Sequence, residues 1–343
     1  MQRVLIIGSG AVGLSVGGWL KEGGLDVTFF DLPKVAAELS SAGLALYLHG
    51  ETARAPAPVK AVSDLAEVAA PDLVVLAVKT YSLDKVAPLV TGRFGKDVLV
   101  LALQNGIGNQ QIVPKHCKRA LYGVVGYNAW IDAPGVVGYQ KKGPLVVGTP
   151  DGSLAAEARE VASTLSRGVE TVYTPRFQDA VHSKMVVNLT NSLQALIGHP
   201  LTPISNPSLF QLLLTQLLWE GVTIVEAAGY KESRIGGMPR WALMWAGANL
   251  PPVLTKGAFK KNVKKMVMSS MAQDVLQRHS RESELETING YLLDLADRAG
   301  LAVPVNRAVY KLCAKHFGAA NFAPLSLEAV WAEVELQRAG SRV

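Results

Sequence analysis

Apolar residues occur as short continuous runs in the first half of the chain. Val4-Leu5-Ile6-Ile7 is typical of a strand that is buried on both faces of a parallel sheet. Further strands are predicted at residues 26–30, 44–48, 56–60, 72–78, 98–103, 121–127, 136–139, 145–147 and 169–173. Helix-like segments separate several of these runs, and this alternation predicts an α/β domain with a parallel sheet.

The apolar period changes at Pro175, and from there on it is helical. Long helices are predicted at residues 178–197 and 209–228, whereas residues 230–256 are rich in Gly, Pro and Trp and are expected to be partly irregular. The sequence therefore predicts an α/β domain over residues 1–175 followed by an all-α domain over residues 176–343.

A glycine-rich loop directly follows the first predicted strand and reads Gly8-Ser9-Gly10-Ala11-Val12-Gly13. In a GxGxxG loop the first glycine makes a tight turn, the second lets a pyrophosphate approach, and the third lets helix and strand pack closely. The following helix directs its first N–H groups at the phosphate. An ordinary strand–helix turn is the alternative, but the order of strand, loop and helix favours a Rossmann-type dinucleotide-binding domain.

Asp31 closes the second predicted strand, some twenty residues beyond the glycine loop. A carboxylate at this position accepts a hydrogen bond from the adenosine ribose 2′-OH and repels a 2′-phosphate, which favours NADH over NADPH. A polar residue that merely ends a strand is the alternative.

Lys79 and Asn105 each follow a predicted parallel strand. Ligands of open α/β sheets bind at the carboxyl ends of the strands, on the same edge as the glycine loop. Each residue alone is compatible with a solvated strand end, but the pair predicts a binding site.

Lys184, Asn188 and Asn191 lie at positions i, i+4 and i+7 of the first helix of the second domain, so they share one face. A solvated polar stripe is the alternative. Asparagine is a poor helix former, however, and a water-facing stripe usually mixes acids with bases. We therefore expect these side chains to bind a ligand. Further along, Ser283 and Glu286 have the spacing of a helix capping box, and an acid at Glu284 suits the first turn of that helix.

The composition limits the classes of partner. The net charge of +6 is spread along the chain except for the lysines of residues 256–265, and no nucleic-acid motif accompanies them. A solvated helix face is the simplest interpretation of that cluster. The apolar segment 209–228 contains Gln and Glu and is expected to be a buried helix rather than a membrane span. The two cysteines lack CxxC spacing, which indicates a reducing, cytoplasmic location and no metal site.

Several segments together resemble the ketopantoate reductase (2-dehydropantoate 2-reductase) family. They are the glycine loop, Leu76-Ala77-Val78-Lys79, Gln104-Asn105-Gly106, Lys184-Met185-Val186-Val187-Asn188, Ser269-Ser270-Met271-Ala272-Gln273-Asp274, Glu284 with Ile288-Asn289-Gly290, and residues 300–304.

The resemblance implies a Rossmann domain, a helical domain and an active site in the cleft between them. It implies that Lys184 is the general acid, that Asn188 and Ser270 contact the substrate, and that Lys79, Asn105, Ala129 and Glu284 lie around the cofactor. The family's second asparagine corresponds to Asn191 or Ser192. The resemblance implies NADPH, whereas Asp31 favours NADH. The arginine that typically holds the 2′-phosphate of NADPH in this family is not found near Asp31.

We therefore predict NAD(P)H-dependent reduction of a 2-oxo acid, 2-dehydropantoate or a related compound, to the 2-hydroxy acid. The alternative within this class is an NAD-dependent dehydrogenase of a bulkier D-2-hydroxy acid. A non-catalytic dinucleotide sensor is the alternative from another class, and the presence of Lys184 argues against it. The expected partner is a small molecule rather than nucleic acid or a membrane. A homodimer is left open as the assembly.

Overall fold

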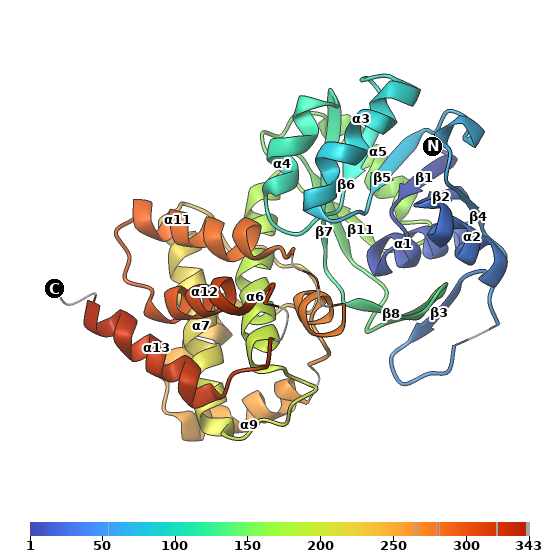
Figure 1. Cartoon of the computed structure of the whole chain (residues 1–343). Coiled ribbons are helices and arrows are strands. Elements are labelled where there is room, and N and C mark those ends of the chain that lie inside the picture. The colour runs from blue at the N-terminus through green and yellow to red at the C-terminus, as the bar shows by residue number, and fades with distance from the viewer. Residues whose placement is uncertain (54, 265, 279, 281, 320–321, 341–343) are drawn as a thin grey trace. The chain divides into compact units, whose positions relative to one another are not determined.

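The computed structural model describes residues 1–53, 55–264, 266–278, 280, 282–319 and 322–340 (Figure 1). This described chain separates into two compact units, Met1–Ala180 and Val181–Val343. Lys265, which belongs to the lysine cluster noted above, lies outside the described residues.

The first unit is α/β. Its strands are β1 (Arg3–Ile7), β2 (Asp26–Phe30), β3 (Ala45–Leu48), β4 (Lys60–Val62), β5 (Leu73–Leu76), β6 (Leu99–Ala102), β7 (Arg119–Val125), β8 (Ala129–Ala133), β9 (Val136–Tyr139), β10 (Leu145–Gly148) and β11 (Thr171–Tyr173). Its helices are α1 (Ala11–Glu22), α2 (Pro33–Ala42), α3 (Leu83–Phe94), α4 (Gly108–Ile112) and α5 (Ala155–Leu165), with short 3₁₀ turns η1 (Leu65–Glu67), η2 (Thr80–Ser82) and η3 (Val113–Lys115).

Within the described residues, eight strands form one sheet in the order β11-β10-β7-β6-β5-β1-β2-β4. The strands from β4 to β7 are parallel, and β10 runs antiparallel to β7. Alternate side chains such as Ile6, Val75 and Leu101 pack with α1 and α5 in one core, and their neighbours Leu5 and Val74 are fully buried as well. Burial of both faces explains why these strands are continuously apolar.

A smaller sheet of described residues has the order β3-β9-β8. The sequence predicted strands at 44–48 and 56–60 on either side of one turn, but they do not form a hairpin. β3 pairs with β9, and the second strand is displaced to Lys60–Val62 and pairs with β2. Leu44 and Ala57 contribute an isolated bridge. The strand β8 was not predicted.

The second unit is helical in its described part. Its helices are α6 (Phe177–Ile197), which begins in the first unit, α7 (Pro207–Ala227), α8 (Trp241–Asn249), α9 (Pro252–Val263), α10 (Ser270–Ala272), α11 (Tyr291–Arg298), α12 (Pro304–His316) and α13 (Leu327–Gly340). Two π-helical segments in this part are η4 (Gln273–Gln277) and η5 (Glu286–Gly290). The segment 230–256 is partly irregular, as predicted: residues 230–240 contain no helix or strand, and α8 and the first turn of α9 follow.

The helix α7 is the central element of the second unit and contacts α8, α9, α11, α12 and α13. Asn206 caps it by accepting a hydrogen bond from the backbone N–H of Leu209 at 3.1 Å. Among the described helices, α7 alone is long and apolar enough to cross a membrane. Half of its most apolar 18-residue stretch is buried inside the protein. Buried residues such as Phe210, Leu213 and Val222 make it a core helix of this unit.

Glu220 of α7 caps a different helix. Its carboxylate accepts hydrogen bonds from the backbone N–H groups of Val305 and Asn306 and from the Asn306 side chain, at 2.9 to 3.1 Å. These N–H groups belong to the first turn of α12, where Val303 provides no side-chain cap. Burial raises the pKa of Glu220, although the hydrogen bonds from Asn306 and Val305 oppose that shift. The contact fastens α12 to α7.

We expect Glu220→Ala to destabilise the protein by about 1–3 kcal/mol, because it leaves buried N–H groups without an acceptor. Thermal unfolding should show a Tm lower by several degrees. The control is Glu226→Ala on the same helix, where the side chain is exposed and the change should stay within about 0.5 kcal/mol. Equal effects of the two substitutions would contradict the capping role.

Candidate active site

The glycine loop has a shape that excludes side chains at two of its three glycines. Gly8 has φ +102°, and a Cβ there would lie 2.8 Å from Val78 Cγ1. A Cβ on Gly13 would lie 2.0 Å from the carbonyl oxygen of Gly8. The turn and the close approach of α1 to β1 therefore both require glycine.

Gly10 differs from the other two, because a Cβ built on it meets no atom within 4 Å. Its φ of −76° and ψ of 178° are open to any residue. Packing within the protein thus gives no reason for glycine at this position. Gly10 is also the N-cap of α1, and it provides no side chain to satisfy the first N–H groups of that helix. Open space in front of uncapped N–H groups fits the pyrophosphate of a dinucleotide.

Asp31 has a role in the protein that the sequence did not indicate. Its Oδ2 accepts a hydrogen bond from the backbone N–H of Ser9 at 2.5 Å, and its Oδ1 accepts one from the backbone N–H of Leu32 at 2.8 Å. The carboxylate therefore ties the glycine loop to the end of β2. Each carboxylate oxygen has a further lone pair, so a ribose hydroxyl can still donate to it. Lys34 is 87% exposed and lies 3.9 Å from Glu38, which gives its charge a partner other than Asp31.

The residues that follow β5 and β6 lie at the same edge of the sheet as the glycine loop, because β1, β5 and β6 are adjacent and parallel. Lys79 precedes η2 and Asn105 follows β6, and both are part-buried. Gln104, to which the sequence analysis assigned no role of its own, is buried and donates to the carbonyl groups of Leu76 and Val78 at 2.8 and 2.9 Å. It joins the two segments that carry Lys79 and Asn105.

Ala129 is part-buried at the start of β8, where it pairs with Tyr139 of β9. It therefore belongs to the smaller sheet rather than to the edge that carries the glycine loop. Among the described residues, no group of three or more His, Cys, Asp or Glu side chains is arranged to hold a metal ion.

In the second unit, α6 buries most of its length but leaves one face partly open. Lys184 and Asn191 are part-buried, whereas Asn188 is 4% exposed. Met185 and Leu189, on the remaining faces, are buried in the helical core. Lys184 and Asn191 are therefore the polar groups of this set that have the most access to a ligand.

Ser192 is wholly buried and belongs to the interior of the unit. Its hydroxyl donates to the carbonyl of Leu189 at 2.7 Å and accepts from Asn289 Nδ2 at 3.0 Å. The Cys313 thiol also contacts its carbonyl oxygen, at 3.7 Å. The hydrogen bond to Asn289 joins α6 to η5. Because the Ser192 hydroxyl already has two partners, Asn191 is the better candidate for a ligand-binding residue.

The two motif segments that follow both adopt π-helical turns. Ser270 is part-buried at the first turn of α10, where the Ser269 hydroxyl accepts from the N–H of Ala272, and η4 follows. Glu284 is 7% exposed and directly precedes the helix that contains η5. π turns within helices often occur at functional sites.

The predicted capping box is wrong in its details. Ser283 Oγ accepts from the N–H of Leu285 at 3.4 Å rather than from that of Glu286. The Glu286 carboxylate instead accepts hydrogen bonds from the Tyr310 hydroxyl. The π turn shifts Glu286 away from the position that a regular first α-helical turn would give it.

Comparison with known proteins identifies both parts of the chain. Residues 4–152 match the family described as "Ketopantoate reductase PanE/ApbA", and residues 176–316 match "Ketopantoate reductase PanE/ApbA C terminal". The 2-dehydropantoate 2-reductases of Archaeoglobus fulgidus and Halobacterium salinarum are each 29% identical to the chain, over 91% of it and 97% of their own length.

Solved structures share the fold. A PanE/ApbA family ketopantoate reductase from Ralstonia eutropha has a TM-score of 0.71 at 24% identity, over 98% of this chain and 100% of its own. A D-mandelate dehydrogenase, solved with NADH and anilino(oxo)acetate, has a TM-score of 0.72 at 20% identity, over 98% of this chain and 99% of its own.

The contrast between Gly10 and Gly13 predicts separable effects. We expect Gly10→Ala to leave the Tm within about 1–2 °C of wild type, because the added Cβ meets nothing, while the Kd for NADH rises at least about tenfold. Gly13→Ala should instead lower the Tm by several degrees, because its Cβ collides with the loop backbone. Thermal unfolding and NADH fluorescence titration measure the two quantities. Unchanged NADH binding by Gly10→Ala would argue against a pyrophosphate at this loop.

Proposed function

Since the chain belongs to the ketopantoate reductase family and is an NAD(P)-dependent oxidoreductase, we propose that it reduces 2-dehydropantoate, or a closely related 2-oxo acid, to the 2-hydroxy acid. In this proposal, residues 1–175 bind the dinucleotide and residues 176–343 provide the substrate-binding and catalytic groups. The observation that carries the proposal is the partly open face of α6, where Lys184 lies on a mostly buried helix within a chain that matches the family in both halves. We place the reaction in the cytoplasm.

Reduction of a carbonyl group is accelerated by a group that stabilises negative charge on the oxygen and donates a proton to it. The nicotinamide dinucleotide, when bound, would supply the hydride to the carbonyl carbon, and negative charge would develop on the oxygen. We assign Lys184 to this oxygen, where its ammonium group stabilises the charge and donates the proton. The same positive charge attracts the carboxylate of a 2-oxo acid.

We assign orientation of the substrate to Asn188, Asn191 and Ser270, because their neutral side chains can form hydrogen bonds to it. Orientation matters because near-attack geometry accounts for a large part of the barrier. Ser192 is left out of this set, since its hydroxyl is already bonded to Leu189 and Asn289. We place the buried Glu284 near the substrate hydroxyl and the cofactor.

For the dinucleotide, we assign the phosphate to the loop from Gly8 to Gly13, including the backbone of Ser9, Ala11 and Val12, and the adenosine ribose to Asp31. Lys79, Asn105 and Ala129 are proposed to lie around the rest of the cofactor. The open space at Gly10 and the free lone pairs of Asp31 support this assignment.

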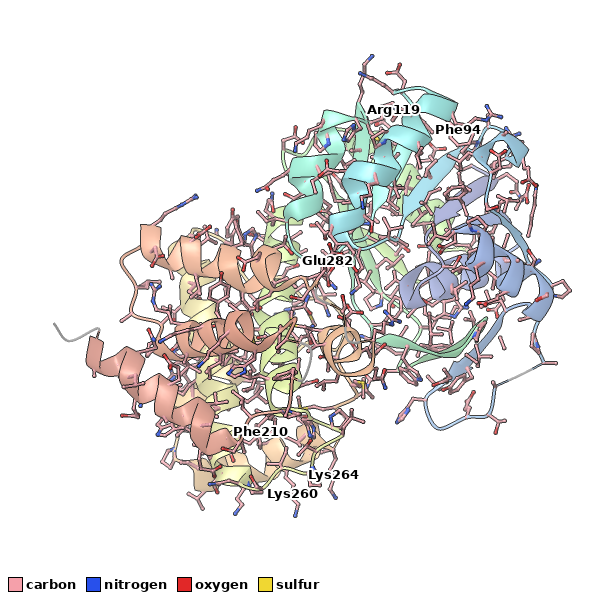
Figure 2. The ribbon with its side chains drawn as sticks, in the orientation of Figure 1. Phe94, Arg119, Phe210, Lys260, Lys264 and Glu282 are labelled. Carbon is pink, nitrogen blue, oxygen red and sulfur yellow. The ribbon has the colours of Figure 1, made fainter. Side chains whose placement is uncertain are left out.

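We expect Lys184→Ala to lower kcat at least about 10²-fold, as is usual for the loss of a general acid, while the protein stays folded and binds NADH. Steady-state assays with a panel of aliphatic and aromatic 2-oxo acids test this, and the same panel identifies the substrate. Lys260→Ala, an exposed lysine on α9, is the control (Figure 2).

Two further variants complete the series. Asn191→Ala should raise KM for the 2-oxo acid, whereas Ser192→Ala should lower the Tm with a smaller effect on KM. A near-normal kcat of Lys184→Ala would exclude the proposed acid, and absence of turnover of every 2-oxo acid by wild type would exclude the reaction.

We also expect a preference for NADH over NADPH of at least about tenfold in kcat/KM. At an effective dielectric of about 20, two unit charges 4 Å apart repel by about 4 kcal/mol, and solvent and salt reduce this. Asp31→Asn removes the charge, keeps one acceptor for the loop and should shift the preference toward NADPH. Arginine at this position would remove both acceptors of the Ser9 and Leu32 N–H groups and is a poorer test. A wild-type preference for NADPH would show that Asp31 does not select the cofactor.

A further inference from the structure

Residues 232–241 form a loop between α7 and α8 that is closed by its own hydrogen bond. The Glu232 carboxylate accepts from the backbone N–H of Trp241 at 2.8 Å, which joins the two ends of the loop. The N–H of Ser233 donates to Ser183 Oγ at 2.9 Å and fastens the loop to α6. Ser183 directly precedes Lys184, so this loop is attached to α6 beside the proposed general acid.

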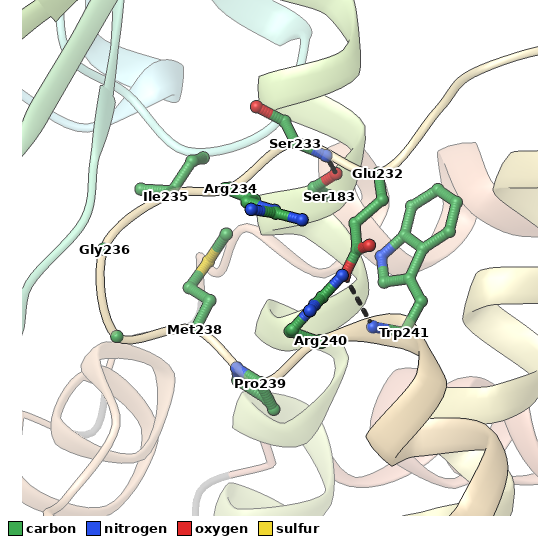
Figure 3. A pocket seen from close by; sticks show the side chains of 11 residues that line it. Ser183, Glu232, Ser233, Arg234, Ile235, Gly236, Met238, Pro239, Arg240 and Trp241 are labelled. Carbon is green, nitrogen blue, oxygen red and sulfur yellow. Dashed lines mark hydrogen bonds and ion pairs between the residues drawn. The ribbon is translucent and has the colours of Figure 1, made fainter.

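The loop encloses a pocket of about 210 Å³, which Ser183 also lines (Figure 3). Ile235 and Trp241 are buried and, with Met238, give the pocket apolar walls. Gly236 and Gly237 form the outer turn, where the absence of side chains leaves the backbone accessible. The pocket is thus partly apolar and lies wholly within the second unit.

Two guanidinium groups give the pocket a positive charge. Arg234 and Arg240 extend into it from opposite arms of the loop (Figure 3). Arg240 Nε lies 4.0 Å from a Glu232 carboxylate oxygen, whereas Arg234 has no ion pair or hydrogen bond among the described residues. The pocket lining therefore contains two guanidinium groups and one carboxylate, Glu232, which also accepts from the Trp241 N–H. The described lining of the pocket therefore has one more positive than negative charge. A guanidinium group is planar and can bind an anion through two N–H groups.

We propose that this pocket is a second anion-binding site, which takes a carboxylate or phosphate group between Arg234 and Arg240 with its carbon skeleton against Ile235 and Met238. Two sources of the anion share this chemistry. One is a distal acidic group on the 2-oxo acid whose carbonyl lies at Lys184, and this source rests on the proposed function. The other is a free anion that regulates the enzyme.

Direct binding tests the site without turnover. Isothermal titration with inorganic phosphate and with succinate should give measurable binding to the wild-type protein, and Arg234→Gln should raise the Kd at least about tenfold. Arg234 has no partner to lose among the described residues, so its replacement should leave the Tm unchanged. Lys260→Gln on α9 removes the same charge away from the loop and should bind as wild type does. Glu232→Gln keeps an acceptor for Trp241 and should tighten binding.

Kinetics distinguish the two sources. If the anion is part of the substrate, Arg234→Gln raises KM for 2-oxoglutarate about tenfold or more and leaves KM for 3-methyl-2-oxobutanoate unchanged. If the anion is free, phosphate alters the turnover of the monoacid by wild type but not by Arg234→Gln.

Absence of binding of both anions to wild type, or equal Kd values for wild type and Arg234→Gln, would overturn the site. Inactivity toward all 2-oxo acids would overturn the proposed function and leave the titration result standing.

Discussion

The hydrogen bonds between the Asp31 carboxylate and the backbone N–H groups of Ser9 and Leu32 are the interaction on which the proposed dinucleotide site depends most. They hold the glycine loop against the end of β2, while Gly8 and Gly13 allow the loop to lie against Val78 and α1. The Asp31 carboxylate therefore holds the loop in place and also puts a negative charge beside it. The same side chain thus affects both the choice of cofactor and the geometry of the loop. A substitution of Asp31 that changes the cofactor preference therefore also disturbs the loop.

Much of the first unit is predictable from its apolar runs. The strands β2 and β9 have the predicted bounds of 26–30 and 136–139, because both are rich in β-branched and aromatic residues and end before a polar residue, Asp31 or Gln140. β8 was missed, since its end residues Asp132 and Ala133 are exposed and break the apolar pattern. The separation of β3 and β4 into different sheets depends on pairing with β9 and β2, which local sequence does not encode.

The helix spacing of Lys184, Asn188 and Asn191 correctly places them on α6 but does not give their burial. Ser192 is withdrawn into the core by Asn289, a residue far along the chain, and no local pattern signals that contact. The π turns η4 and η5 could not be predicted either, because the apolar periodicity was interpreted with an α-helical repeat. One such turn explains the misassigned cap at Ser283. The sequence thus predicted which residues share a helix face, and long-range packing determined which of them are accessible.

The hydrogen bond between Glu232 and the N–H of Trp241 has a consequence for evolution and for enzyme engineering. A loop that is closed at its base can change its interior residues without altering the helices on either side. Arg234 is exposed and, among the described residues, makes no hydrogen bond or ion pair, whereas Gly237 has φ +84° and favours glycine. Position 234 can therefore be varied while the hydrogen bond between the loop and Ser183 of α6 is kept. Under the proposed role of this pocket, the substrate repertoire of such a chain can diverge faster than its chemistry.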